Sequence, residues 1–98
     1  YRCASGEIVV IHDRTLKRTT GTSGYVARKT LKALKKLDAG NGETIPTLTE
    51  LLDALTPKAT VFIEIKATAA AKPTAKIITE YAEKHKVPYE RMPVISFN

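Results

Sequence analysis

The sequence predicts an α/β fold with a parallel sheet covered by helices. Short apolar segments rich in β-branched residues lie at about 7–11, 60–66 and 93–97, and each is a predicted strand. Segments with apolar residues at helical spacing separate them, in the order strand, helix, helix, strand, helix, strand. Strands that alternate with amphipathic helices form βαβ units, so these strands are expected to run parallel.

The first predicted strand spans residues 7–11. Ser5 and Gly6 directly before it fit a tight turn, so the residues ahead of the turn should pair with this strand. Residues 14–26, "RTLKRTTGTSGYV", are rich in Thr, Gly and Ser and are predicted to be a loop. This loop either wraps an anion with its backbone N–H groups and Arg18, or is a surface excursion turned by its glycines.

Two helices are predicted before the second strand. Thr30 can cap the first helix, which residues 38–42 end. The second helix begins in "IPTLTELLDAL", where Thr47 and Glu50 have the spacing of a capping box. Pro57 ends it. The leucines of each helix share one face: Leu31, Leu34 and Leu37 in the first, and Leu48, Leu51, Leu52 and Leu55 in the second.

The second strand, 60–66, leads into a third helix that starts near Pro73 and ends before the third strand, 93–97. Lys84 and Lys86 suit the negative C-terminal end of this helix dipole. Its apolar face is made by the residues Ile77, Ile78, Tyr81, Ala82 and, beside them, His85.

The chain of 98 residues is basic, with a net charge of +6 and a pI near 9.6. The lysines are spread along the sequence without interleaved aromatic residues, which favours a solvated surface over nucleic-acid binding. A module that binds an anion or nucleic acid without catalysis stays an alternative. The single cysteine, Cys3, excludes an internal disulfide and a cysteine-based zinc site, and no apolar run is long enough to be a transmembrane segment.

A carboxylate and an ammonium group follow the apolar part of the second strand. Side chains alternate along a strand, so Phe62, Glu64 and Lys66 share the face opposite the helices. The two charged residues lie at the C-terminal end, where parallel α/β sheets carry their active sites. The strand rise sets them roughly 6.5–7 Å apart, which is too far for an ion pair. This spacing suits a cation on Glu64 and an anion on Lys66; a solvated polar strand tip is the alternative.

His12 and Asp13 directly follow the first strand, again at a C-terminal end. A histidine there can move protons near neutral pH. The alternative is a structural loop residue. His85, near a helix end, has only a structural interpretation.

The runs "GEIVVIHDRTLKRTTGTSGYV", "LDAG", "IPTLTELLDAL", "VFIEIK" and "ISFN" stand in the order typical of one family. The chain closely resembles the glycerophosphodiester phosphodiesterase family over nearly its whole length. The resemblance implies that residues 1–98 are a single incomplete domain, roughly the early-to-middle βα units of a (β/α)8 TIM barrel.

The resemblance also implies a function. Family members hydrolyse glycerophosphodiesters to glycerol 3-phosphate and an alcohol with Mg²⁺ or Ca²⁺, which implies a role in lipid and glycerol metabolism. Glu64 matches a metal ligand, Lys66 the lysine beside the phosphate, and His12 one of two catalytic histidines, as acid or base. The substrate is expected to be a small-molecule glycerophosphodiester, attacked by its own glycerol hydroxyl through a cyclic phosphate.

Family motifs that hold the other histidine and two acidic ligands, "H-R-G" and "E-x-D", do not occur ahead of Tyr1. Both ends of the chain are therefore expected to be cut. The 98 residues alone should be inactive, and should need the remainder of the barrel or a second copy to fold. A related phospholipase-D-type barrel stays an alternative. The lack of cysteine pairs favours the cytoplasm, with an extracytoplasmic location left open.

Overall fold

The computed structural model describes residues 1–96 of the chain. The chain divides into two compact units, Tyr1–Thr47 and Leu48–Asn98. Each has its own buried residues and its own hydrogen bonds, and each is described by itself below.

The first unit starts with a hairpin. Arg2 and Ile8 form an antiparallel bridge, and the N–H of Gly6 donates to the carbonyl of Cys3 at 3.0 Å. Gly6 has a φ of 98°, which is accessible to glycine at little cost. The turn predicted at Ser5 and Gly6, with a pairing segment ahead of it, is confirmed.

The prediction of a continuous strand over 7–11 is wrong, because this segment forms only isolated bridges. The N–H of Val9 donates to the carbonyl of Tyr1 at 2.9 Å, whereas the N–H of Val10 donates to the carbonyl of Pro46 at 2.9 Å. Consecutive N–H groups of an extended chain point to opposite sides. The two N–H groups therefore bond to different segments of the chain. Neither segment stays beside residues 7–11 long enough to form a continuous ladder.

Short helices follow in the segment predicted to be a loop, and the loop prediction is wrong at residues 17–20. Helix α1 spans Lys17–Thr20, and it ends at Gly21, whose φ is 76° and whose N–H donates to the carbonyl of Lys17. A 3-10 turn, Val26–Arg28, comes next. Sequence propensity missed α1 because a single turn of Thr-rich helix is held by packing of the neighbouring Leu16, which is fully buried.

Helix α2 spans Leu31–Leu34. The predicted cap is confirmed, because the Thr30 hydroxyl oxygen accepts from the N–H of Ala33 at 3.2 Å. The helix is shorter than its leucine stripe predicts, and the N–H of Leu37 already bonds three residues back, to the carbonyl of Leu34. The core of the first unit consists of Cys3, Val9, Leu16, Val26, Leu34 and Ile45.

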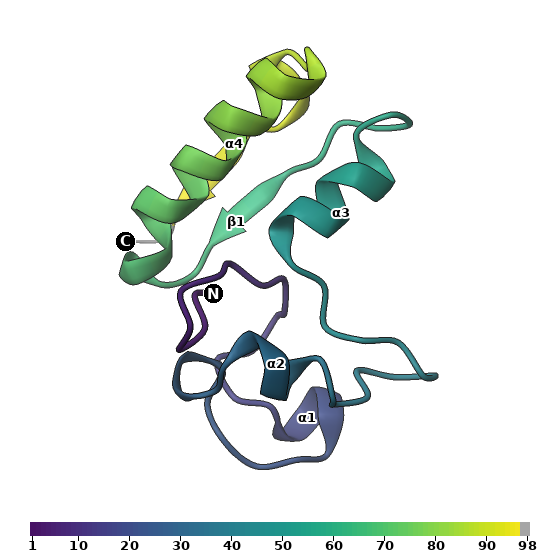
Figure 1. Ribbon diagram of the computed structural model, residues 1–98, viewed down its shortest axis with the longest axis vertical. Coiled ribbons are helices and arrows are strands. Elements are labelled where there is room, and N and C mark those ends of the chain that lie inside the picture. The colour runs from purple at the N-terminus through teal and green to yellow at the C-terminus, as the bar shows by residue number, and fades with distance from the viewer. Residues whose placement is uncertain (97–98) are drawn as a thin grey trace. The chain divides into compact units, whose positions relative to one another are not determined.

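The second unit is a βαβ unit preceded by a helix (Figure 1). Helix α3 spans Leu48–Leu55, and it ends before Pro57 as predicted. Strand β1 spans Ile63–Ile65, helix α4 spans Ala71–His85, and strand β2 spans Val94–Ser96. Figure 1 shows α3 and α4 on either side of β1. The capping box at Thr47 and Glu50 stays a prediction.

Strands β1 and β2 are parallel, with Ile63 opposite Val94 and Glu64 opposite Ile95. The predicted parallel arrangement is therefore confirmed in this unit, although both strands are shorter than predicted. The last predicted strand residue, Phe97, lies outside the described residues. In β1 the predicted alternation holds, since Ile63 is buried and Glu64 is exposed. The face that carries Glu64 is thus opposite the buried one.

The apolar face of α4 is buried as predicted at Ile78, Tyr81 and Ala82. The Tyr81 hydroxyl donates to Asp53 Oδ1 of α3 at 2.8 Å. At the C-terminal end of the helix, Lys86 has a φ of 54°, a left-handed conformation that ends the helix. Side-chain and backbone bonds thus fix both the packing of α4 and the point where the chain leaves it.

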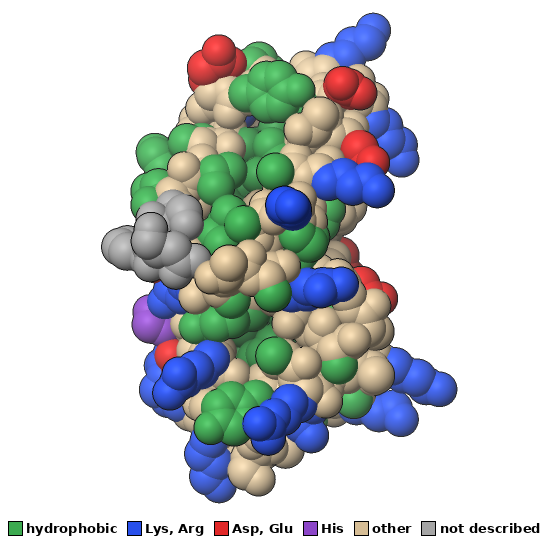
Figure 2. Space-filling model, turned by 90° about the vertical axis from the view of Figure 1, so that its left-hand side faces the viewer, with side chains coloured by type: hydrophobic (Ala, Val, Ile, Leu, Met, Phe, Trp, Pro, Cys, Tyr) green, Lys and Arg blue, Asp and Glu red, His purple; other side chains and the backbone are tan. Residues whose placement is uncertain are grey.

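Apolar side chains also reach the surface, and several gather on the face shown in Figure 2. Lys and Arg side chains project from separate places on that face rather than in one stripe. Within residues 1–96, no helix is long and apolar enough to cross a membrane. In the second unit the large exposed apolar residues are Leu55, Phe62, Tyr89, Val94 and Ile95.

Candidate functional site

Three side chains of the first unit form a connected polar group. His12 Nδ1 lies 2.8 Å from Asp13 Oδ1. Arg18 donates from Nε to Asp13 Oδ2 at 2.6 Å and from Nη2 to Oδ1 at 3.1 Å. The imidazole is 74% exposed, whereas the carboxylate is only 24% exposed. The exposed imidazole of His12 is therefore held by the Asp13 carboxylate, and both oxygens of this carboxylate accept hydrogen bonds from Arg18.

Hydrogen bonds set the electrostatics of this group. The hydrogen bonds from Arg18 hold the pKa of the Asp13 carboxyl well below its ordinary value, and the contact with His12 is the second cause of this shift. The same carboxylate raises the pKa of Arg18. Asp13 is therefore ionised throughout the neutral range and can only accept hydrogen bonds.

The backbone around this group is fixed by the core. The N–H of Leu16 donates to the carbonyl of Gly24 at 2.9 Å, and the N–H of Val26 donates to the carbonyl of Arg14 at 2.9 Å. Leu16 and Val26 are fully buried. Arg18 lies on α1, which begins directly after the anchored Leu16. Its guanidinium is directed to Asp13, which favours the surface-excursion interpretation of the loop over an anion-wrapping one.

The second unit contributes a charged pair at the end of β1. Glu64 Oε1 lies 3.8 Å from Lys66 Nζ, and the side chains are 45% and 24% exposed. The prediction that the two are too far apart for an ion pair is wrong. The strand rise sets the separation of the backbones, but the long flexible lysine side chain brings its ammonium group back toward the carboxylate.

Glu64 fits a divalent cation as one ligand among several. Its carboxylate oxygens are the hard donors that Mg²⁺ and Ca²⁺ prefer, and they remain accessible on the exposed face of β1. Residues 1–96 contain no group of three or more His, Cys, Asp or Glu side chains that could hold a metal ion. The described residues therefore do not form a complete set of ligands around Glu64.

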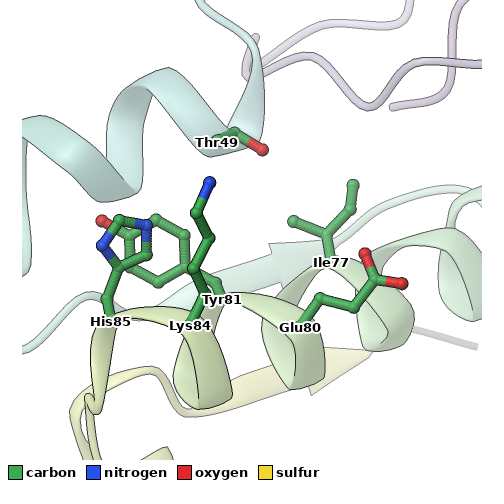
Figure 3. A pocket seen from close by; sticks show the side chains of 6 residues that line it. All are labelled: Thr49, Ile77, Glu80, Tyr81, Lys84 and His85. Carbon is green, nitrogen blue, oxygen red and sulfur yellow. The ribbon is translucent and has the colours of Figure 1, made fainter.

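A pocket of about 190 Å³ lies between α3 and α4 (Figure 3). The rings of Tyr81 and His85 stack there with centroids 4.2 Å apart. His85 thus has a packing role, in agreement with its structural interpretation. The pocket is lined by Thr49, Ile77, Glu80, Tyr81, Lys84 and His85.

Residues 3–89 match the family model described as the glycerophosphoryl diester phosphodiesterase family. The chain belongs to this family. The matched range contains His12, Glu64 and Lys66, and the resemblance seen in the sequence motifs is confirmed.

Individual family members are similar over much of the chain. A glycerophosphodiester phosphodiesterase of Caldanaerobacter subterraneus subsp. tengcongensis is 41% identical over 95% of this chain and 42% of its own length. A Mycobacterium tuberculosis protein named probable glycerophosphodiester phosphodiesterase 2 is 44% identical over 74% of this chain and 27% of its own length. This chain thus spans less than half the length of either relative.

A solved structure supports the fold of this family member. The crystal structure of glycerophosphodiester phosphodiesterase from Agrobacterium tumefaciens str. C58 matches with a TM-score of 0.81 at 30% sequence identity. The match covers 100% of this chain and 43% of that chain. The predicted fold class, an α/β part of a (β/α)8 TIM barrel, is confirmed.

The sequence interpretation missed Arg18 as the partner of Asp13. It weighed Arg18 only as an anion-binding residue. A carboxylate and a guanidinium five positions apart, on either side of a buried leucine, were the available signal. That signal becomes specific only once α1 is known to turn the chain back.

Proposed function

We propose that the whole protein containing this chain hydrolyses glycerophosphodiesters to glycerol 3-phosphate and an alcohol. The observation that carries the proposal is the family match over residues 3–89, which includes both charged groups described above. The relatives' names supply the reaction, and the polar side chains at 12, 64 and 66 are of the types it needs. Such a reaction would belong to lipid and glycerol metabolism.

In this proposal Glu64 is one ligand of a divalent cation, either Mg²⁺ or Ca²⁺. When bound, the cation would neutralise charge on the phosphoryl oxygens. The Lys66 ammonium binds a phosphate oxygen, for which its position 3.8 Å from Glu64 Oε1 is suited. A phosphate oxygen bound by Lys66 would replace part of the attraction between Lys66 and Glu64 with a charge-assisted hydrogen bond, while the cation would offset the charge of the Glu64 carboxylate.

His12 is the proposed catalytic residue. Hydrolysis of a phosphodiester requires that an attacking hydroxyl lose a proton and that the leaving alkoxide gain one. An exposed imidazole beside an ionised carboxylate can perform either transfer near neutral pH. We assign the second transfer to a residue other than His85, because the His85 ring is stacked on Tyr81 in the α3–α4 pocket.

Residues 1–96 supply only part of the site as proposed. Glu64 is a single ligand, and the described residues hold no cluster of three potential ligands. We expect the isolated chain to be inactive and to require the rest of a barrel, or a second copy, for folding. Turnover of glycerophosphocholine by the isolated chain would contradict this expectation. The cytoplasm as compartment stays a prediction.

Substitutions in the whole protein test the roles. Glu64→Gln should abolish the metal-dependent release of glycerol 3-phosphate from glycerophosphocholine, because the amide no longer carries the charge that holds the cation. His12→Ala should lower kcat by about 10²- to 10⁴-fold, the usual contribution of a general acid or base. Its affinity for Mg²⁺ or Ca²⁺, measured by titration, should be nearly unchanged.

The control is Glu83→Gln, a carboxylate lost from the exposed surface of α4. This variant should retain wild-type kcat and metal affinity. Normal metal-dependent activity in the Glu64→Gln variant would remove the metal role of Glu64. A His12→Ala variant with unchanged kcat would remove the catalytic role of His12.

A further inference from the structure

We propose that Asp13 and Arg18 are positioning residues. The carboxylate of Asp13, oriented by Arg18, fixes the neutral imidazole of His12 with its hydrogen on Nδ1. Nε2 is then the atom that exchanges a proton with the substrate. The inference rests on the proposed function only for the role of His12, since the placement of the imidazole hydrogen is a property of the free protein.

The first step is the contact between Nδ1 and the carboxylate. The 2.8 Å separation of His12 Nδ1 and Asp13 Oδ1 is that of a hydrogen bond. An ionised carboxylate has no hydrogen to donate, so the shared hydrogen must be carried by Nδ1. In a neutral imidazole this leaves the lone pair on Nε2.

The second step is the support of the carboxylate itself. Arg18 contacts both oxygens of Asp13, through Nε at 2.6 Å and through Nη2 at 3.1 Å. Two contacts from one planar guanidinium fix the plane of the carboxylate as well as its charge. Oδ1, the oxygen that meets His12, is one of the two oxygens so held.

The third step explains why Arg18 can hold this position. It lies on α1, which follows the fully buried Leu16 and ends at Gly21 in a left-handed conformation. The N–H of Thr20 donates to the carbonyl of Leu16 at 2.8 Å, and the Thr20 hydroxyl donates to the same carbonyl at 2.8 Å. The arginine is therefore presented by an anchored turn, not by a free loop.

Stability does not account for this arrangement. The Arg18 side chain is 67% exposed, and an ion pair with so much exposure contributes little to folding. Its removal should therefore leave the fold intact while releasing the carboxylate. That separation makes the role of Arg18 testable without unfolding the protein.

The direct test is the nitrogen-15 NMR spectrum of the His12 ring in the whole protein, assigned with a His12→Gln variant. At a pH where the ring is neutral, the wild-type spectrum should show the hydrogen on Nδ1. Asp13→Asn can present its amide N–H₂ to Nδ1, which then becomes the acceptor, so the hydrogen should move to Nε2. Wild-type protein with the hydrogen on Nε2 would overturn the inference without any variant.

Kinetics give the second readout. Asp13→Asn should lower kcat by no more than His12→Ala does, that is by up to about 10²- to 10⁴-fold, with little change in KM, because the wrong tautomer leaves no lone pair on Nε2. Arg18→Ala should lower kcat by about 10- to 100-fold, the loss that is typical when a residue supporting a functional side chain from behind is removed. Arg18→Lys should recover part of this loss. Arg14→Ala, which removes an exposed arginine from the same segment, is the control and should behave as wild type.

The outcomes separate this inference from the proposed function. If the hydrogen lies on Nδ1 and moves in the Asp13→Asn variant, but His12→Ala retains activity, the positioning is correct and the catalytic role of His12 is wrong. If His12→Ala is inactive while Asp13→Asn changes neither the ring spectrum nor kcat, His12 is catalytic and Asp13 does not position it.

Discussion

The hydroxyl of Tyr81 offers a sharp test of how α4 is held against α3. The side chain is buried, with 7% of its surface exposed, and its hydroxyl donates to Asp53 Oδ1 at 2.8 Å. Thr56 Oγ1 lies 3.4 Å from the same hydroxyl. Tyr81→Phe removes these contacts and keeps the ring, including its stacking on His85.

The magnitude follows from what each partner loses. A hydrogen bond to a charged acceptor contributes about 1.5–3 kcal/mol, and a neutral one about 0.5–1.5 kcal/mol. Asp53 is exposed, so water replaces the lost donor at its carboxylate. Thr56 Oγ1 still donates to the carbonyl of Leu52 at 2.7 Å. We therefore expect Tyr81→Phe to lower the free energy of unfolding by only about 1 kcal/mol.

Urea denaturation of the whole protein, followed by circular dichroism, measures this change. A double-mutant cycle with Asp53→Ala should give a coupling energy of at least about 0.5 kcal/mol. Tyr89→Phe, at an exposed tyrosine, is the matched control and should stay within about 0.5 kcal/mol of wild type. A Tyr81→Phe variant as stable as wild type, or a cycle without coupling, would refute the reasoning.

Two further changes test local features. Lys86→Gly should raise the free energy of unfolding by about 0.5–1 kcal/mol, because relief of the left-handed conformation at φ 54° outweighs the added freedom of glycine in the unfolded chain. Lys84→Gly, within α4, should instead lower it by about 1 kcal/mol, and the reverse order in urea denaturation would contradict the assigned helix end. The lowered pKa of Asp13 means that its contribution to stability is present above the ordinary value of 3.8 and is lost as pH falls through the folded-state value. Because the pair is exposed, urea midpoints measured between pH 5 and pH 2 should fall only slightly more steeply for wild type than for Asp13→Asn, and a shallower fall for wild type would count against the ion pair.

Hydrophobic periodicity predicted α4 and β1 well, because each buries one apolar face within the second unit. The contacts behind these patterns join residues far apart in the sequence, such as Tyr81 and Asp53, but periodicity depends only on which face is buried. The segment 7–11 shows where this fails. Its β-branched residues are typical of a strand, yet pairing depends on neighbours from elsewhere in the chain, and these meet it at single residues.

The sequence indicated candidate site residues by type and position, and their roles stay predictions; it did not predict the geometry in which their side chains meet. A histidine and a carboxylate after one strand, and Glu64 with Lys66 in another, indicated where charged groups would stand. The ion pair at 3.8 Å and the clamp of Arg18 on Asp13 depend on side-chain rotamers and on the turn made by α1. Neither has a signature in backbone periodicity, because both depend on side-chain atoms several bonds from the chain.

The division of the chain into two compact units has a consequence for how this protein responds to heat and to mutation. His12 belongs to one unit and Glu64 to the other, and each is supported by a separate set of buried residues. Opening fluctuations of one unit can then displace the imidazole while the carboxylate keeps its place, or the reverse. Amide exchange rates around the two residues should accordingly report two distinct opening free energies, so that a substitution in one core lowers protection in its own unit first.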